Sequence, residues 1–489
     1  MTERMSATDV SFLYLEGRTT PQHVGGIAVF EMPAEGFDYD RLIQLLDERI
    51  SLVPRYRQKV RTVPGHLANP VWVDDPSFDI TYHVRRSALP RPGTDAQLVE
   101  FAARIQSRPL DRNRPLWEMY LLEGLSDDRL AIITKTHSAM IDGVGTVDIV
   151  QVILDESPQP HRTVEALWMP EPEPSGKSLV VDALTGALRR PTAIVDAARL
   201  GAKDARVVLG RVSSGVTHVV ASAASVVRPR PPAPLSVTIG EQRRIAIARS
   251  CLDDYRQVRR AHGGTVNDVV LATVAGALRG WLLSRDVPIE PGLTVRVLAP
   301  VSVAESGDVY DSRVAGLLVD LPVGEPDPLR RLAQVRAATA AHIASGRSVA
   351  ADALVEFSGL APPTLHALGA RAAHSLTRRM FSLVVTNVPG PQTSLYAAGA
   401  RLLEMYPIVP LNGGQALSIG LTSYDGGVYF GLNGDRDAVP DLRVVAELVE
   451  QSLAELVELS PDVDDVVSID PSERRTRRPS PRSPVGPRR

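Results

Sequence analysis

The chain has 489 residues, which is too long for one ordinary hydrophobic core and favours two large domains. Hydrophobic residues make up 44% and charged residues 23%, so intrinsic disorder is excluded for the chain as a whole. The formal net charge of −3 gives no argument for nucleic-acid binding, and the single cysteine, Cys251, excludes an intrachain disulfide and a cysteine-rich zinc site.

Both the N-terminal sequence and the cysteine content indicate a protein of the cytoplasm. Residues 1–6 lead directly into polar sequence and lack the apolar core of a secretory signal. No stretch reaches 18 uninterrupted apolar residues, so we expect no membrane-spanning helix. Any contact with the inner membrane or with lipid droplets would then be peripheral.

The first 157 residues alternate between strand and helix patterns. Residues 25–32, 116–125 and 129–136 are apolar runs of strand length, and residues 39–50 have helical spacing. A further helix is predicted to begin shortly after residue 143. This texture predicts a mixed α/β domain.

A segment of different composition follows at residues 158–243. Prolines cluster at both of its ends, and residues 178–227 are rich in Ala and Val with interspersed basic residues, as expected of amphipathic helices. Two interpretations are open: helices that pack across both domains, which we favour, or a helix that lies on a membrane surface. In either case the segment links two domains.

The α/β texture resumes after the linker. Residues 424–427, Tyr-Asp-Gly-Gly, separate two short apolar runs and indicate a hairpin with a tight turn. The other predicted elements are helices at 250–262, 266–283 and 327–345 and strands at 293–303, 416–423 and 428–433.

The last twenty residues alternate Arg with Ser and Pro, a composition that cannot bury a core. A disordered basic tail at 470–489 either binds an anionic membrane surface or only solvates the chain end. The predicted organisation is therefore an N-terminal domain at 1–157, a linker at 158–243, a C-terminal domain at 244–469 and this tail.

The segment from Lys135 to Gly143 carries the most specific signal. It contains His137, Ser138, Asp142 and Gly143 in an arrangement that differs at one position from the His-His-x-x-x-Asp-Gly signature of coenzyme-A-dependent acyltransferases. The position that differs is the second histidine, the general base of that signature, where this chain has Ser138. The sequence thus predicts an acyltransferase, and the serine at the position of the general base makes its catalytic turnover doubtful.

Further motifs make the chain resemble the bacterial wax ester synthase/diacylglycerol acyltransferase family. They are spread over both halves of the sequence and leave only the linker and the tail outside the resemblance. They comprise Ser6-Ala7-Thr8-Asp9, Gln22-His23-Val24-Gly25-Gly26, Pro54-Arg55-Tyr56-Arg57, His83-Val84-Arg85, Pro115-Leu116-Trp117-Glu118, Val266-Asn267-Asp268-Val269, Pro300-Val301-Ser302 and Asn387-Val388-Pro389-Gly390-Pro391.

The resemblance implies a fold and a reaction. The fold is two chloramphenicol acetyltransferase-like mixed α/β domains with a tunnel between them, in which acyl-CoA and the acceptor alcohol meet. The implied substrates are long-chain acyl-CoA with diacylglycerol or a long-chain alcohol, and no cofactor is implied beyond acyl-CoA as co-substrate. Asp142 is implied to brace the turn after the signature strand, and Gly143 allows that turn to be tight.

Ester formation from a thioester needs a base that removes the proton of the alcohol, and an imidazole suits this role near neutral pH. Because successive side chains of an extended segment point to opposite faces, His137 and Ser138 are not expected to face the tunnel together. If Asp142 fixes the register, Ser138 occupies the base position and His137 packs behind the turn. A local shift of the turn would instead let His137 act as proton acceptor.

Other candidate residues have structural interpretations as well. Trp117 is a candidate for substrate contact, although filling the core is the favoured interpretation. Asn267 and Asp268 either cap a helix or lie near the tunnel, where the resemblance places them. The block at residues 387–391 is interpreted chiefly as a turn. The scattered histidines show no metal-binding spacing, so we expect no metal.

Three functions fit these residues. The first is acyl-CoA-dependent synthesis of triacylglycerol or wax esters, with activity in doubt because of Ser138. The second is a catalytically silent homologue that binds acyl-CoA or neutral lipid. The third is a condensation-type enzyme acting on carrier-protein thioesters, against which the family blocks at both ends of the chain argue.

Overall fold

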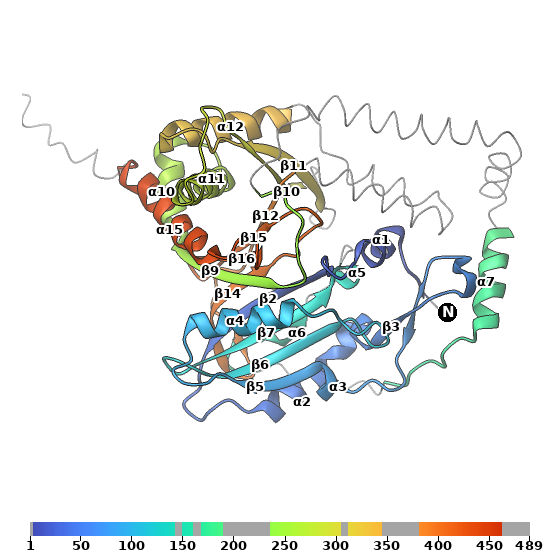
Figure 1. Cartoon of the computed structure of the whole chain (residues 1–489). Coiled ribbons are helices and arrows are strands. Elements are labelled where there is room, and N and C mark those ends of the chain that lie inside the picture. The colour runs from blue at the N-terminus through green and yellow to red at the C-terminus, as the bar shows by residue number, and fades with distance from the viewer. Residues whose placement is uncertain are drawn as a thin grey trace, which may run out of the picture.

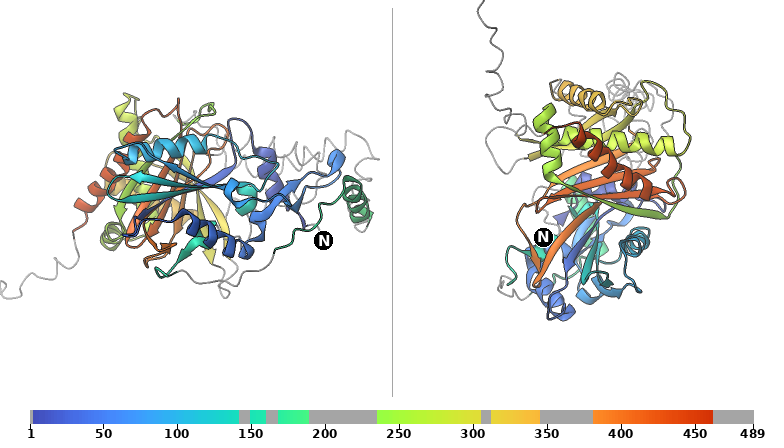
Figure 2. Two further views of the ribbon diagram at one scale, coloured as in Figure 1. Left: turned by 90° about the horizontal axis from the view of Figure 1, so that it is seen from below. Right: turned by 90° about the vertical axis from the view of Figure 1, so that its left-hand side faces the viewer.

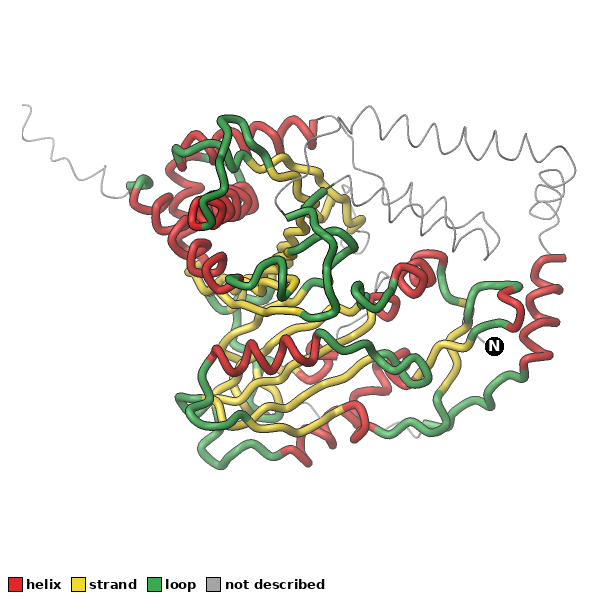
Figure 3. Tube along the Cα trace, in the orientation of Figure 1, coloured by secondary structure: helices red, strands yellow, loops and turns green. Residues whose placement is uncertain are grey.

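The computed structural model describes residues 3–141, 149–159, 168–188, 235–304, 312–344 and 381–461. Three predictions fall outside these residues: the turn at Asp142 and Gly143, most of the linker helices, and the basic tail. The described chain forms two units, each of which combines a sheet with helices (Figures 1 and 3). This arrangement confirms the predicted mixed α/β class with two domains.

The first unit contains a seven-stranded sheet with the strand order β5-β6-β7-β2-β14-β13-β8. Strands β5 and β6 are parallel, whereas β6, β7, β2 and β14 pair in antiparallel fashion. The predicted strands at 25–32, 116–125 and 129–136 are confirmed. The strands from the first half of the chain are β2 (His23–Glu31), β5 (Val84–Ala88), β6 (Trp117–Leu125), β7 (Arg129–His137) and β8 (Leu154–Asp155).

Strand β7, which carries the signature at its end, is buried on both faces. Its neighbouring residues Ile132 and Ile133 belong to two different hydrophobic clusters, one on each side of the sheet. The first cluster includes side chains of α2 (Tyr39–Arg49), and the second includes side chains of α4 (Asp95–Gln106). The continuous apolar run that predicted this strand is explained by this double burial.

Shorter helices surround the sheet. Helix α1 begins with a capping box between Ser6 and Asp9 and ends directly before Glu16, and α1 packs against α5. The shorter helical segments are α1 (Ala7–Leu15), α3 (Ile80–His83), α5 (Ser138–Ile141), α6 (Ile149–Ile153) and the 3₁₀ turns η1 (Ile50–Leu52), η2 (Pro54–Arg57) and η3 (Pro64–His66).

A small three-stranded sheet lies beside the first unit, in the order β1 (Glu3–Arg4), β4 (Val71–Asp74), β3 (Gln58–Arg61). Leu179 and Ala183 of α7 (Gly176–Leu188) pack against its valines. Figure 1 shows α7 at the margin of the molecule, away from the second unit. Helix α7 therefore packs on the N-terminal unit, whereas Leu235, near the other end of the linker, belongs to the core of the second unit. The favoured interpretation, helices that pack across both domains, concerns mostly residues outside the described ones and stays a prediction.

The second unit is a six-stranded sheet with the order β11-β10-β12-β15-β16-β9. Helices gather on one side of this sheet, which Figure 2 shows from two further directions. The strands are β9 (Arg243–Cys251), β10 (Val295–Ala304), β11 (Ser312–Leu321), β12 (Leu383–Pro389), β15 (Leu417–Tyr424) and β16 (Gly427–Asp435). The helices are α10 (Leu252–His262), α11 (Val266–Ser284), α12 (Pro328–Ala344) and α15 (Leu442–Glu458).

Helix α11 is the central helix of this unit. By length and composition it is the one helix of the described chain that is long and apolar enough to cross a membrane, yet 67% of its most apolar window is buried inside the protein. Leu271, Leu278 and Trp281 are part of the hydrophobic core of the second unit. Its apolar character is accounted for by this core position.

The chain crosses from the second unit to the first and back around residues 396–408, a crossover that the sequence did not predict. Strands β13 (Tyr396–Ala397) and β14 (Ala400–Ile408) come from the predicted C-terminal domain but belong to the seven-stranded sheet of the first unit. Strand β14 pairs with β2 from Gly25 to Phe30, and Figures 1 and 2 show it beside the strands of the first unit. The domain boundary near residue 243 stays a prediction, and this crossover ties the two units together.

The predicted hairpin is confirmed and the predicted turn at 387–391 is partly wrong. Strands β15 and β16 are joined at Asp425 and Gly426, both of which have positive φ, as a type I′ turn requires. Residues 387–389 instead form the end of β12, which pairs in parallel with β15 up to Pro389 and Ser423. Pro389 is tolerated because it lies at the end of the strand, so the turn begins only at Gly390.

Candidate functional site

The signature lies where β7 ends and α5 begins. His137 is the last residue of β7, its backbone N–H donates to the Leu116 carbonyl at 2.9 Å, and it stands directly opposite His23 of β2. Its side chain is only 1% exposed. Because it belongs to a paired strand, the position of His137 is set by the sheet.

The imidazole of His137 caps helix α5. Its Nδ1 atom accepts the backbone N–H of Ala139 at 3.0 Å. Ser138 is the first residue of α5 and Ala139 the second, so this bond satisfies one of the free donors at the start of the helix, as an N-cap side chain does. An atom that accepts from a backbone N–H carries no proton, so the neutral ring holds its proton on Nε2.

The Nε2 atom of His137 faces a carboxylate. Its distance to Oε1 of Glu16 is 3.7 Å, and it makes no hydrogen bond to any described residue. Glu16 also accepts hydrogen bonds from the Arg112 guanidinium, with Nε at 3.0 Å, and from the Gln22 backbone N–H at 3.4 Å. Burial opposes ionisation of Glu16, but the contacts with His137 and Arg112 lower its pKa to about 2. Glu16 is therefore a carboxylate at neutral pH.

Ser138 occupies a buried position beside this group. Its backbone N–H donates to the Gln22 carbonyl at 2.8 Å and its side chain is 8% exposed. Within the described part of the chain, its hydroxyl makes no hydrogen bond to an imidazole or a carboxylate. A serine without an adjacent base is not an activated nucleophile, so the interpretation of Ser138 as a small residue in the base position is favoured.

Replacing His137 distinguishes its two possible roles, helix cap and general base. We expect His137→Asn to lose less stability than His137→Ala, because Asn is a good N-cap and Ala is not, with a difference of about 1 kcal/mol between the two variants. Urea unfolding midpoints measure this difference. Residual acyl transfer should follow the same order. Equal loss of activity in both variants, at unequal stability, would instead identify His137 as the base.

Two further basic groups lie on the face of the sheet that α4 covers. Lys135 is fully buried and donates to the backbone carbonyls of Ile105, at 3.2 Å, and Arg108, while His23 Nε2 lies 2.8 Å from the Gln106 carbonyl. Both groups thus satisfy carbonyls at and just beyond the C-terminal end of α4, where cations and donors are favoured. Burial lowers the pKa of Lys135 to about 8, although Glu118 opposes that shift.

The buried His23 makes stability depend on pH. Burial, followed by the charge of Lys135, lowers its pKa to about 3 from 6.5. Between these pH values the unfolded state binds a proton that the folded state does not, so the free energy of unfolding should rise with pH, by at most about 1.4 kcal/mol per pH unit from this group. Urea unfolding from pH 4 to 7 measures the slope. His23→Asn should flatten it and the exposed control His66→Asn should not; equal slopes in all three proteins would contradict the linkage.

Trp117 belongs to the core, which confirms the favoured interpretation. Its side chain is fully buried, its Nε1 donates to the Tyr56 carbonyl at 2.8 Å, and its ring stacks on His83 with centroids 4.7 Å apart. These contacts hold the start of β6 against η2 and α3. They give no support to its alternative as a substrate contact.

In the Asn-Asp block, Asp268 has a structural role, whereas Asn267 is a candidate for substrate binding. Thr265 is the N-cap of α11, and the Asp268 carboxylate accepts from the Thr265 N–H and hydroxyl, both at 2.8 Å, and from the Thr339 hydroxyl at 2.6 Å. The capping interpretation is thus confirmed for Asp268. Asn267 is half-buried, and its Oδ1 accepts a hydrogen bond from Nδ2 of Asn387, near the end of β12, at 3.5 Å. Asn267 remains a candidate for substrate binding, with Asn387 beside it.

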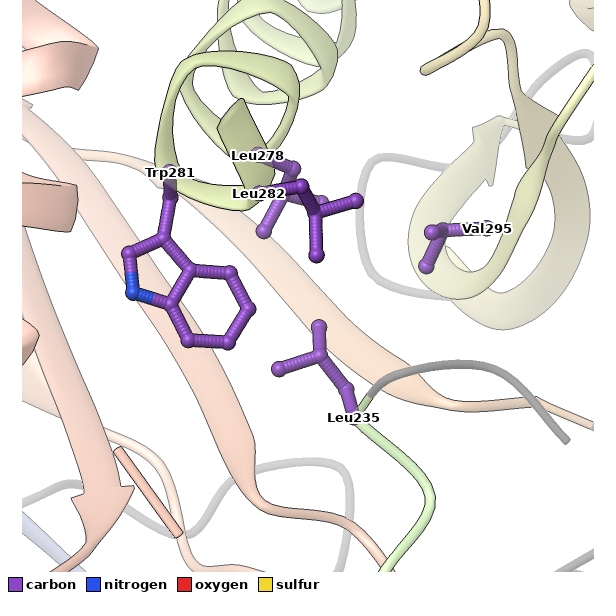
Figure 4. A pocket seen from close by; sticks show the side chains of 5 residues that line it. All are labelled: Leu235, Leu278, Trp281, Leu282 and Val295. Atoms are coloured by element: carbon purple, nitrogen blue, oxygen red, sulfur yellow. The ribbon is translucent and has the colours of Figure 1, made fainter. Parts of the chain in front are cut away.

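The structure does not place the signature and the Asn-Asp block in one described pocket. A small apolar pocket of the second unit is lined by Leu235, Leu278, Trp281, Leu282 and Val295 (Figure 4). The indole N–H of Trp281 is already bonded to Asp441 at 3.1 Å, so this pocket has no free donor to orient a polar substrate. The tunnel between the domains therefore stays a prediction.

No metal is needed to explain the contacts of the signature. Among the described residues, no three His, Cys, Asp or Glu side chains are grouped so that they could hold a metal ion. The expectation that the reaction needs no metal remains a prediction.

Sequence reasoning did not single out Glu16, Arg112 or Lys135 as members of the site. Glu16 and Arg112 are 96 residues apart in the sequence, and Glu16 reaches the signature because α1 packs against α5. The one available signal was weak: a charged residue in the apolar run of a buried strand, as at Lys135, predicts a buried partner.

Comparison with known proteins identifies the fold. Over 94% of this chain and 99% of the other, it is similar to the wax ester synthase/diacylglycerol acyltransferase from Marinobacter aquaeolei VT8, at 30% identity and a TM-score of 0.66. A starter condensation domain of rhizomide synthetase matches 96% of this chain and 97% of its own length, at 15% identity and a TM-score of 0.54, which shows the fold alone. The protein thus has the two-domain fold of the chloramphenicol acetyltransferase-like superfamily.

The sequence comparisons are more specific. Residues 5–270 match the family model of the wax ester synthase/diacylglycerol acyltransferase catalytic domain, and residues 312–457 match that of the family's C-terminal domain. A probable diacylglycerol O-acyltransferase of Mycobacterium tuberculosis, tgs2, is 34% identical over 92% of this chain and 98% of its own length. Another from the same organism, tgs3, is 45% identical over 53% of this chain and 96% of its own length. The chain belongs to the wax ester synthase/diacylglycerol acyltransferase family.

Proposed function

We propose that this protein transfers the acyl group of a long-chain acyl-CoA to the free hydroxyl of diacylglycerol, with a long-chain alcohol as the alternative acceptor, and that it does so slowly. Family membership supports the acyltransferase reaction with acyl-CoA as donor. The observation that supports slow transfer is the capping bond between His137 and Ala139 at 3.0 Å. This bond engages the one imidazole of the signature in capping α5 and supports the assignment of Ser138 to the base position.

The reaction joins the acceptor oxygen to the thioester carbon, and the coenzyme A thiolate leaves. Its difficult part is removal of the hydroxyl proton as the new bond forms, because a neutral alcohol attacks a thioester slowly. Ser138 cannot supply this proton acceptor, since its hydroxyl has no basic neighbour among the described residues. Binding and orientation of the two substrates still accelerate the step, which accounts for a low rate instead of none.

The second candidate function is a catalytically silent protein that binds acyl-CoA or neutral lipid. The same observation favours it, because a chain without a base keeps its substrate-binding surfaces. Donor binding would then persist while transfer falls to the uncatalysed rate.

One assay separates these functions. The purified full-length protein is incubated with palmitoyl-CoA and diacylglycerol, triacylglycerol is quantified by chromatography, and palmitoyl-CoA binding is measured by calorimetry. We expect slow turnover above a heat-inactivated control, and hexadecanol in place of diacylglycerol tests the alternative acceptor. Binding without turnover would establish the silent lipid-binding function.

We also propose peripheral contact with the inner membrane or with lipid droplets through the basic tail at residues 470–489. Its arginines would be attracted to anionic headgroups, and this attraction is screened by salt. Deleting the tail should weaken binding to anionic vesicles at low ionic strength. Unchanged binding would remove the tail from the proposal.

A further inference from the structure

Glu16 is the one acidic side chain in contact with the signature histidine among the described residues, and the reaction as written above gives it no role. It follows the last residue of α1, and its side chain is only 10% exposed. One carboxylate oxygen faces His137, and the other accepts from Arg112. A carboxylate held between an imidazole and a guanidinium has a defined orientation.

We infer that Glu16 is a positioning residue of the signature: its carboxylate, held by Arg112, accepts the Nε2 proton of His137 and keeps the ring in the tautomer that caps α5. The side chain at position 138 is thereby fixed in the base position. The effect of Glu16 on the His137 tautomer does not depend on catalysis, whereas the effect of Glu16 on the rate of transfer rests on the proposed function.

The hydrogen bonds of the imidazole lead to this inference. Nδ1 accepts the Ala139 N–H, so the proton of the neutral ring lies on Nε2. A buried N–H without an acceptor is costly, and Nε2 has no hydrogen bond to any described residue. The Glu16 carboxylate at 3.7 Å needs to move by well under 1 Å to accept it. The proton on Nε2 and the cap on Nδ1 therefore depend on each other.

The neighbours of Glu16 keep it available for this role. Arg112 donates to Oε2 and also to the Leu13 carbonyl at 3.0 Å, which fixes the guanidinium to the end of α1 and leaves Oε1 toward the histidine. His23, opposite His137 in the sheet, does not compete, because its Nε2 is directed to the Gln106 carbonyl. The arrangement resembles the carboxylate–histidine pairs that fix the tautomer of a functional histidine elsewhere.

The tautomer of His137 is directly measurable. In the full-length protein with ¹⁵N-labelled histidine, long-range ¹H–¹⁵N spectra report which ring nitrogen carries the proton, and His137→Asn assigns the signal. We expect a single Nε2–H tautomer in the wild type and a shift toward a tautomer mixture in Glu16→Ala. Glu241→Ala, which removes the exposed partner of Arg18, is the matched control and should leave the signal unchanged.

A volume-preserving variant guards against misfolding. Glu16→Gln keeps an oxygen acceptor but loses the charge, so it should retain more of the Nε2–H form than Glu16→Ala. In the Ser138→His background, Glu16→Ala should reduce kcat by about ten- to a hundredfold with little change in KM, because the base is misplaced and not the substrate. An unchanged His137 tautomer in both Glu16 variants overturns the inference, whether or not Ser138→His is active.

Discussion

We expect Ser138→His to raise the rate of acyl transfer by about 10²–10⁴-fold, the range that a positioned general base contributes. Position 138 is the first residue of α5, its backbone is held by the Gln22 carbonyl at 2.8 Å, and the preceding histidine already caps the helix. The substitution therefore restores an imidazole at a position whose backbone is fixed by existing contacts. The expected change is in kcat, since the substrate contacts are unaltered, and it is measured as triacylglycerol formed from palmitoyl-CoA and diacylglycerol.

Two variants control for side effects of this substitution. Ser138→Ala should behave like the wild type, because the hydroxyl has no catalytic role in the proposal. Ser138→Asn adds a side chain of intermediate size without a base and should give no gain. If Ser138→Ala abolishes the wild-type activity, Ser138 itself takes part in the chemistry and the proposal of a vacated base position is wrong.

Arg49→Ala should cost about 3–5 kcal/mol of stability, the usual effect of breaking a buried ion pair by removing one partner. Arg49 and Asp155 are 6% and 7% exposed, and the guanidinium donates to both carboxylate oxygens at 2.9 and 2.8 Å. A third bond, to the Val152 carbonyl at 3.0 Å, ties α2 to the segment that follows the signature. The variant leaves Asp155 buried without its cation, which accounts for the size of the loss.

The midpoint of urea unfolding measures this loss. The matched control is Arg256→Ala, which removes an exposed i,i+3 pair with Asp253 and should change stability by less than about 1 kcal/mol. The double variant Arg49→Met with Asp155→Leu should recover part of the loss, since no uncompensated charge remains. Similar midpoints for Arg49→Ala and Arg256→Ala would show that the buried pair is not important for stability.

Local sequence patterns predicted those helices, strands and turns that are defined by residues adjacent in the chain. The apolar runs of β2, β6 and β7, the helical spacing of α2 and α11, and the Asp425-Gly426 turn are each defined by a few consecutive residues. Strand β9 was missed, because its apolar residues form only the short run 245–248 between arginines. Two of these arginines bind the first unit: Arg249 contacts Asp95 and Glu404, and Arg243 contacts Thr19. Those partners are distant in the chain.

The sequence by itself determined the family, the α/β class and the doubt about turnover, because the signature and the flanking motifs are short-range patterns of residue types. Only the tertiary structure decided that β13 and β14 complete the sheet of the first unit and that the His137 imidazole caps α5 toward Glu16. The pairing of β14 with β2 and the contact of His137 with Glu16 both join residues more than a hundred positions apart. Local periodicity carries no information about such contacts, since packing of distant segments defines them.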